Sequence, residues 1–138
     1  MRVVIDTNCL VASIPKSGAG YWLYLAFRAK KFTWVVSTEI LNEYFEILSN
    51  FYSPETAEIV MTTLLSSPNV ELTEAFFNYN LIVKDPDDNK FANLAISCNA
   101  RYLVSNDKHF NIFKKIEFPP LDVIKFDEFK EILAQLNV

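Results

Sequence analysis

The sequence predicts an α/β fold with three layers, in which helices cover both faces of a mostly parallel sheet of about five strands. Two observations lead to this prediction. Short runs rich in β-branched and aromatic residues alternate along the chain with longer segments that carry apolar residues at three- and four-residue spacing. Strands that alternate with helices pair in parallel, because each helix carries the chain back to the starting end of the sheet.

The predicted elements follow one another without a repeat, a linker or a low-complexity segment, so we expect one domain over residues 1–138. Ser37 is a candidate N-cap for the second helix, and Ser53 followed by Pro54 is typical of a helix start. The runs bounded by polar or turn residues are the expected strands: 2–5, 33–36, 70–72, 101–104 and 122–124. The segments with helical spacing are the expected helices: 21–30, 38–50, 54–66, 88–99 and 127–136.

The composition excludes several classes of protein. A chain of 138 residues that is 51% hydrophobic can form a core of its own. The net charge of −4 argues against a broad basic surface for duplex DNA or anionic lipid. Cys9 and Cys98 have no ligand-like neighbours, which disfavours a disulfide framework and a zinc site. No apolar run has the length of a signal peptide or a membrane span, so we expect a cytoplasmic protein with no membrane partner.

Two aspartates follow predicted strands. Asp6 ends the first strand, and Asp107 comes shortly after the fourth. Either residue alone would be explained by an Asx turn or a helix cap. Together they lie at the carboxyl edge of one parallel sheet, which is where open α/β sheets bind their ligands. We therefore expect a functional site at this edge.

The helix over 38–50 offers three glutamates, and helical geometry separates them. With about 100° between successive residues, Glu43 falls at the border between the polar and the apolar face. Glu39 and Glu46 fall deeper in the polar arc, where they serve as solubilising charges. Glu43 is therefore the glutamate expected to reach a cleft.

Three carboxylates also crowd the start of the helix over 88–99, at Asp85, Asp87 and Asp88. One carboxylate would be enough to cap the helix. The surplus of like charges predicts a bound cation. Asp88 lies one turn before Phe91 on the core-facing stripe, which aims it at the sheet edge better than Asp87.

Four acidic residues thus approach one edge of the predicted sheet: Asp6, Glu43, Asp88 and Asp107. Oxygen ligands without histidine or cysteine suit Mg²⁺ or Mn²⁺. Two such ions about 4 Å apart can stabilise the attacking and leaving oxygens of a phosphodiester. The predicted chemistry is phosphoryl transfer.

Four motifs in order resemble the PIN-domain nucleases, and in particular their subgroup of toxin–antitoxin toxins: residues 2–8 (RVVIDTN), 37–43 (STEILNE), 85–91 (DPDDNKF) and 102–107 (YLVSND). The resemblance implies a Mg²⁺- or Mn²⁺-dependent endoribonuclease for single-stranded RNA with Asp6, Glu43, Asp88 and Asp107 as its acidic quartet. Because the family motif contains both aspartates, Asp85 could replace Asp88 as the metal ligand. The resemblance also implies an antitoxin partner or a homodimer that covers apolar surface near Tyr21, Trp22 and Tyr24.

The remaining candidates are weaker. Asn8, Ser105, Lys90 and Lys108 flank the acidic motifs and are candidates for contacts with the RNA. His109, the single histidine, is expected at the surface and outside catalysis. Two alternatives stay open, a degenerate domain that only binds RNA or protein and an aspartyl-phosphate phosphatase. The phosphatase usually needs a second aspartate two residues after the first, where this chain has Asn8.

Overall fold

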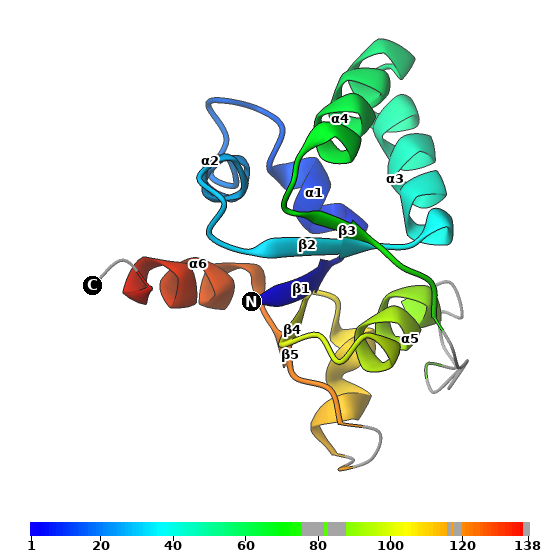
Figure 1. Cartoon of the computed structure of the whole chain (residues 1–138), viewed down its shortest axis with the longest axis vertical. Helices are drawn as coiled ribbons and strands as arrows, with labels where there is room; N and C mark the ends of the chain where they lie inside the picture. The colour runs from blue at the N-terminus through cyan, green and yellow to red at the C-terminus, as the bar shows by residue number, and fades with distance from the viewer. Residues whose placement is uncertain (76–81, 83–87, 116, 118–119, 137–138) are drawn as a thin grey trace.

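A computed structural model describes residues 1–75, 82, 88–115, 117 and 120–136 of the chain. It confirms a central sheet of five strands, all of them parallel, in the spatial order β3-β2-β1-β4-β5 (Figure 1). Val3 of the central strand pairs with Trp34 on one side and Tyr102 on the other. The strands are β1 (Arg2–Ile5), β2 (Thr33–Val36), β3 (Val70–Leu72), β4 (Tyr102–Val104) and β5 (Val123–Ile124).

Helices connect the strands, and those expected from the sequence have boundaries close to the predicted ones. Ser37 and Ser53 are the N-caps they were predicted to be, accepting hydrogen bonds from the backbone N–H groups of Ile40 and Thr56. Two elements were not predicted, a six-residue helix after β1 and a 3₁₀-helix after β4. The helices are α1 (Thr7–Ala12), α2 (Trp22–Arg28), α3 (Thr38–Phe51), α4 (Pro54–Ser66), α5 (Asn89–Ser97), the 3₁₀-helix η2 (Lys108–Lys114) and α6 (Phe126–Gln135).

The helices form a layer on each side of the sheet, as predicted. Parallel strands are joined by right-handed crossovers, so the side that a helix covers depends on the direction in which the chain moves across the sheet. From β1 to β3 the chain moves one way, and α1 to α4 lie above the strands in Figure 1. It then returns past β1 to β4 and β5, and α5 lies below them. The connections on the two sides of the gap between β1 and β4 therefore run in opposite directions across the sheet, which makes this gap the switch point of the sheet.

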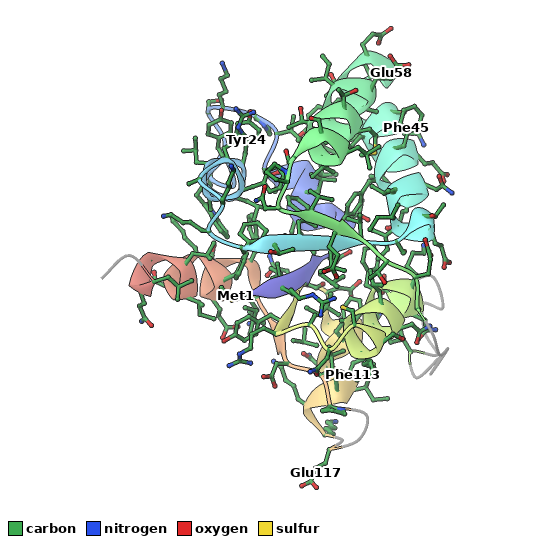
Figure 2. The ribbon with its side chains drawn as sticks, viewed as in Figure 1. Met1, Tyr24, Phe45, Glu58, Phe113 and Glu117 are labelled. Carbon is green, nitrogen blue, oxygen red and sulfur yellow. The ribbon has the colours of Figure 1, made fainter. Side chains whose placement is uncertain are left out.

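The core holds the sheet against these layers, and it also fixes the carboxyl end of β1. Val3, Val4 and Ile5 are fully buried, and side chains fill the space between the sheet and the helices (Figure 2). The buried hydroxyl of Tyr44 on α3 donates a hydrogen bond to the Ile5 carbonyl and accepts one from the Trp34 indole. Because Glu43 precedes Tyr44, this contact also sets the face that α3 presents at the end of β1.

The chain between α1 and α2 passes very close to α1. A Cβ added at Gly20 would lie 2.4 Å from the carbonyl oxygen of Ala12 and 3.1 Å from the ring of Phe126. Only glycine allows this approach, which brings α1, α2 and α6 together. Trp22 of α2 packs against α6, with its ring 4.5 Å from that of Phe126. Within the part of the chain that the structure describes, no helix is long and apolar enough to cross a membrane.

Candidate active site

β1 and β4 are parallel neighbours at the switch point of the sheet, so their carboxyl ends lie side by side. The backbone N–H of Asp6 donates to the carbonyl of Val104 at 3.0 Å, which continues the pairing of the two strands. Ligand sites of open α/β sheets lie at such a switch point, beyond the carboxyl ends of the strands. The loops after β1 and β4 therefore meet where a site is expected.

Asp6 is the most buried carboxylate of this edge, with 5% of its surface exposed. It stands at the N-cap of α1, but its side chain makes no capping bond and instead accepts a 2.7 Å hydrogen bond from the Ser105 hydroxyl. Burial raises the pKa of Asp6 to about 6. The Ser105 hydrogen bond opposes this rise, whereas the charges of Asp107 and Glu43 add to it. The ionised carboxylate of Asp6 thus lies in an environment that disfavours negative charge.

Glu43 faces the same edge from α3, as the helical phase predicted. It is half-buried, while Glu46 is exposed. One carboxylate oxygen accepts a hydrogen bond from the Thr7 hydroxyl of α1. The other accepts a 2.6 Å ion-paired hydrogen bond from the Lys90 ammonium of α5. Glu43 therefore joins three helices, and Lys90 partly neutralises it.

Asp88 and Asp107 come together with a third residue, His109. The Nδ1 atom of His109 lies 3.3 Å from an Asp88 oxygen and 3.4 Å from an Asp107 oxygen. Ligand atoms of all three residues lie within 4.8 Å of one another, which makes them a candidate metal-binding group. Asp88 is 9% exposed and stands at the N-cap of α5, although its side chain makes no capping hydrogen bond to that helix.

His109 corrects a prediction, because the sequence placed it at the surface and outside the site. The structure shows a half-buried imidazole against two carboxylates. The error arose because a histidine outside a metal motif has no periodic pattern to mark it. The single available signal was its position two residues after Asp107, within the first turn of η2.

The other predicted site residues divide into exposed and buried ones. Asn8 is exposed and lines, with Asp6 and Asp107, a hollow of about 210 Å³. Lys108 is exposed as well. Ser105, predicted to contact the RNA, is only 3% exposed and donates a hydrogen bond to Asp6, so it positions that carboxylate. Lys90 is paired with Glu43, and Asp85 lies outside the residues that the structure describes.

Asn106 and Asn89, which the sequence did not single out for a role, hold the loops of the site. The side-chain oxygen of Asn106 accepts a hydrogen bond from the N–H of Phe126 at 2.9 Å, which ties the loop after β4 to α6. Asn89 is buried and exchanges two hydrogen bonds with the backbone of Ile82, of 2.9 and 3.0 Å. A lone asparagine has no spacing that would reveal such contacts in advance.

Residues 2–109 of the chain match the family model of the PIN domain. The match covers most of the sequence and includes Asp6, Glu43, Asp88 and Asp107. The chain therefore belongs to the PIN domain family, as its motifs indicated. No curated protein sequence matches it.

Solved structures with a similar fold come from bacterial VapBC and VapC proteins. VapBC2 from Rickettsia felis, bound to a DNA fragment from its promoter, contains a chain that is 25% identical, with a TM-score of 0.64 over 91% of this chain and 98% of that one. VapC20 of Mycobacterium tuberculosis, a Sarcin-Ricin loop cleaving toxin, is 13% identical, with a TM-score of 0.60 over 80% and 93%. DNA-bound VapBC from Salmonella typhimurium is 16% identical, with a TM-score of 0.59 over 91% and 98%. The last two likenesses concern the fold alone.

Proposed function

We propose that this chain is a divalent-cation-dependent endoribonuclease that cleaves single-stranded RNA and acts as the toxin of a toxin–antitoxin pair. One observation carries the proposal: the nearly buried carboxylate of Asp6 lies beside Asp107 and Glu43 at the switch point of the sheet. Among the residues that the structure describes, Asp6 forms no ion pair with a lysine or arginine. A bound cation would supply the missing positive charge.

The donor set fits a hard divalent ion. Asp88 and Asp107 belong to the candidate metal-binding group, and Asp6 offers a further carboxylate beside Asp107; carboxylate oxygens are the ligands that Mg²⁺ and Mn²⁺ prefer. Glu43 completes the acidic quartet from α3, and Asp85 remains a further candidate ligand. When bound, the ions would polarise the phosphodiester and activate the attacking water.

The surrounding residues orient these carboxylates. The Ser105 hydroxyl donates to Asp6 and accepts the Asp107 N–H at 3.0 Å, so one side chain fixes both aspartates relative to each other. Thr7 and Lys90 each hold one of the two carboxylate oxygens of Glu43. Such fixed orientation keeps ligands in place before substrate arrives. Asn8 and Lys108, both exposed beside the aspartates, are the proposed contacts to the RNA backbone.

Cleavage of a single-stranded RNA tests the proposed activity. We expect cleavage with Mg²⁺ or Mn²⁺ and none with chelator. Asp6→Asn and Asp107→Asn should each lower the rate at least about 100-fold, because misplaced ions lose several kcal/mol of transition-state stabilisation. Lys114→Ala, a change at an exposed position of η2, is the matched control and should keep the wild-type rate. Equal cleavage by all preparations would reveal a contaminating ribonuclease and refute the proposal. Binding of RNA without turnover would favour a degenerate binding module.

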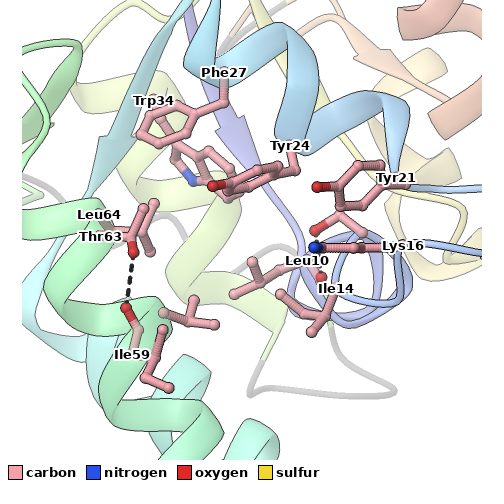
Figure 3. A pocket seen from close by; sticks show the side chains of 12 residues that line it. Leu10, Ile14, Lys16, Tyr21, Tyr24, Phe27, Trp34, Ile59, Thr63 and Leu64 are labelled. Atoms are coloured by element: carbon pink, nitrogen blue, oxygen red, sulfur yellow. Dashed lines mark hydrogen bonds between the residues drawn. The ribbon is translucent and has the colours of Figure 1, made fainter.

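The proposed partner site is an apolar pocket on the opposite side of α1. It has a volume of about 220 Å³, and Tyr21, Tyr24, Ile14 and Leu64 are among the side chains that surround it (Figure 3). Trp22, which was expected in the same contact surface, packs against α6. We place the antitoxin at Tyr21 and Tyr24, with a homodimer as the rival assembly. Light scattering of the purified chain at micromolar concentration tests the dimer, and co-purification with the product of the neighbouring gene tests the antitoxin.

A further inference from the structure

We propose that His109 is a direct ligand of the catalytic cation, through Nδ1, beside Asp88 and Asp107. The nitrogen donor would make the site prefer Mn²⁺ to Mg²⁺. This inference rests on the proposed function, because it requires that the acidic residues hold a cation. It departs from the sequence-based expectation of a site built only from oxygen ligands.

The distances from the imidazole to the two carboxylates agree with a shared ion. Ligand atoms about 2.1 Å from an ion are about 3.0 Å apart when they subtend 90° and about 3.4 Å apart at the tetrahedral angle. The Nδ1 atom of His109 lies 3.3 Å from the Asp88 oxygen and 3.4 Å from the Asp107 oxygen. Both separations fall within this range, so the imidazole and either carboxylate are spaced as two ligands of one ion, and the ligand atoms of all three residues lie within 4.8 Å of one another.

An ordinary hydrogen bond explains the imidazole less well. A charge-assisted N–H···O contact between a histidine and a carboxylate is usually about 2.7–2.9 Å long. His109 lies more than 3.2 Å from both carboxylate oxygens, and its Nδ1 is nearly equidistant from them. A nitrogen directed at one hydrogen-bond acceptor would approach that acceptor more closely than the other. The Asp107 oxygen is the one that also accepts the His109 backbone N–H, whereas the Asp88 oxygen comes from the start of another helix, so the imidazole lies between two carboxylates that distant segments bring together.

The backbone holds the imidazole at this place. The N–H of His109 donates to an Asp107 oxygen at 2.9 Å, so Asp107 caps the 3₁₀-helix that carries the histidine. The next residue, Phe110, is fully buried, and Phe113 is 4% exposed, which anchors η2 on the core. The side chain of His109 itself keeps 28% of its surface exposed, so an ion can reach it from solvent.

The expected preference follows from ligand chemistry. Mg²⁺ is a hard ion that is bound by oxygen and keeps several waters, whereas imidazole nitrogen is a good ligand for first-row transition ions. A site with one nitrogen and two carboxylates should therefore bind Mn²⁺ more tightly than Mg²⁺. Removal of the nitrogen should weaken Mn²⁺ much more than Mg²⁺.

Calorimetric titration of the full chain with each ion measures the preference. We expect His109→Ala to weaken Mn²⁺ binding about 10-fold or more, in the range seen when residues around a metal are removed, and to change Mg²⁺ binding less than about 3-fold. Asn111→Ala, at an exposed position of the same 3₁₀-helix, is the matched control and should change neither affinity. Equal effects of His109→Ala on the two ions, or no effect on either, would overturn the inference.

A second measurement needs no variant. The chain has one histidine, so all imidazole signals in its NMR spectrum belong to His109. Upon addition of Co²⁺, a coordinated ring should show large contact-shifted resonances. If Co²⁺ binds and these resonances are absent, His109 is not a ligand, and the inference fails while the proposed function stands. If the wild type binds none of the three ions, the proposed function fails with it.

Discussion

Replacement of Asp6 by asparagine should stabilise the metal-free protein at neutral pH, although Asp6 is a proposed ligand. The pKa of the folded carboxyl is about 6, compared with an ordinary value of 3.8. Burial is the main cause, and Asp6 is only 5% exposed, so little solvent screens the effect. A difference of this size corresponds to about 3 kcal/mol of stability, since one pKa unit is worth about 1.4 kcal/mol.

The direction of this effect with pH follows from proton binding. Between about pH 4 and pH 6 the folded protein keeps a proton on Asp6 that the unfolded chain has released. Stability therefore falls as the pH rises through this window, and above it the ionised carboxylate exerts its full destabilising effect. Asparagine is neutral at every pH and accepts the Ser105 hydrogen bond with its own oxygen. Its added N–H donors cost about 1–3 kcal/mol if they remain unpaired.

We therefore expect Asp6→Asn to be more stable than wild type at pH 7.5 in chelator, by up to about 3 kcal/mol, a rise in Tm of up to roughly 10 °C at this chain length. The difference should vanish near pH 4. Asp122→Asn, which removes a carboxylate that is 65% exposed and paired with Arg101, is the control and should change stability by less than about 1 kcal/mol. Thermal melts at both pH values decide the matter. The electrostatic reasoning would be refuted if Asp6→Asn were less stable than wild type at pH 7.5, or if the difference in stability between the two proteins did not change with pH.

Three further predictions use matched pairs or paired conditions. Glu43→Gln should lower ribonuclease activity about 100-fold, because it removes the charge that Thr7 and Lys90 orient, whereas exposed Glu46→Gln should stay within about 3-fold of wild type in the same assay. Gly20→Ala should cost about 1–3 kcal/mol in denaturant unfolding, because its Cβ would lie 2.4 Å from a backbone oxygen, while Gly18→Ala, whose nearest contact is 3.2 Å, should cost clearly less. Asp88→Asn should leave the protein in chelator at least as stable as wild type, and should lose most of the roughly 1.4 kcal/mol that Mn²⁺ at about ten times its Kd adds to the wild type. If the Tm of the wild type did not change on addition of Mn²⁺, the last prediction would be contradicted.

The strands and long helices could be predicted because burial imposes a period on the sequence. Val3 to Ile5 are fully buried as a run that α/β packing requires, and α3 shows its apolar stripe through Ile40, Tyr44 and Leu48. The same apolar stripe allowed Glu43 to be placed at the border between the polar and the apolar face of the helix. By contrast, α1 has six residues and begins directly after Asp6, and η2 has seven. Elements this short complete too few turns to show a period.

Contacts between distant segments explain what the sequence did not reveal about the site. His109 meets Asp88 across 21 positions, and Ser105 meets Asp6 across 99. Nothing local distinguishes a histidine beside a carboxylate from one at the surface, or a serine that contacts ligand from one that positions an aspartate. These roles depend on how η2 and β4 dock against β1 and α5. The three aspartates could be singled out in advance because strand ends and helix starts give their positions directly, and Glu43 because the apolar stripe of α3 gives its phase.

Three helix starts meet at the site, and each has an aspartate at its N-cap: Asp6 for α1, Asp88 for α5 and Asp107 for η2. A capping carboxylate at a helix start is stabilised by backbone N–H groups, which normally explains the residue in full. Here Asp107 alone caps its helix through its side chain, whereas the side chains of Asp6 and Asp88 make no capping bond. The Asp6 carboxylate is instead held by the Ser105 hydroxyl and by the backbone of Thr7. Asp6 and Asp88 lie buried at the same edge of the sheet, where the proposed cation would offset their negative charge.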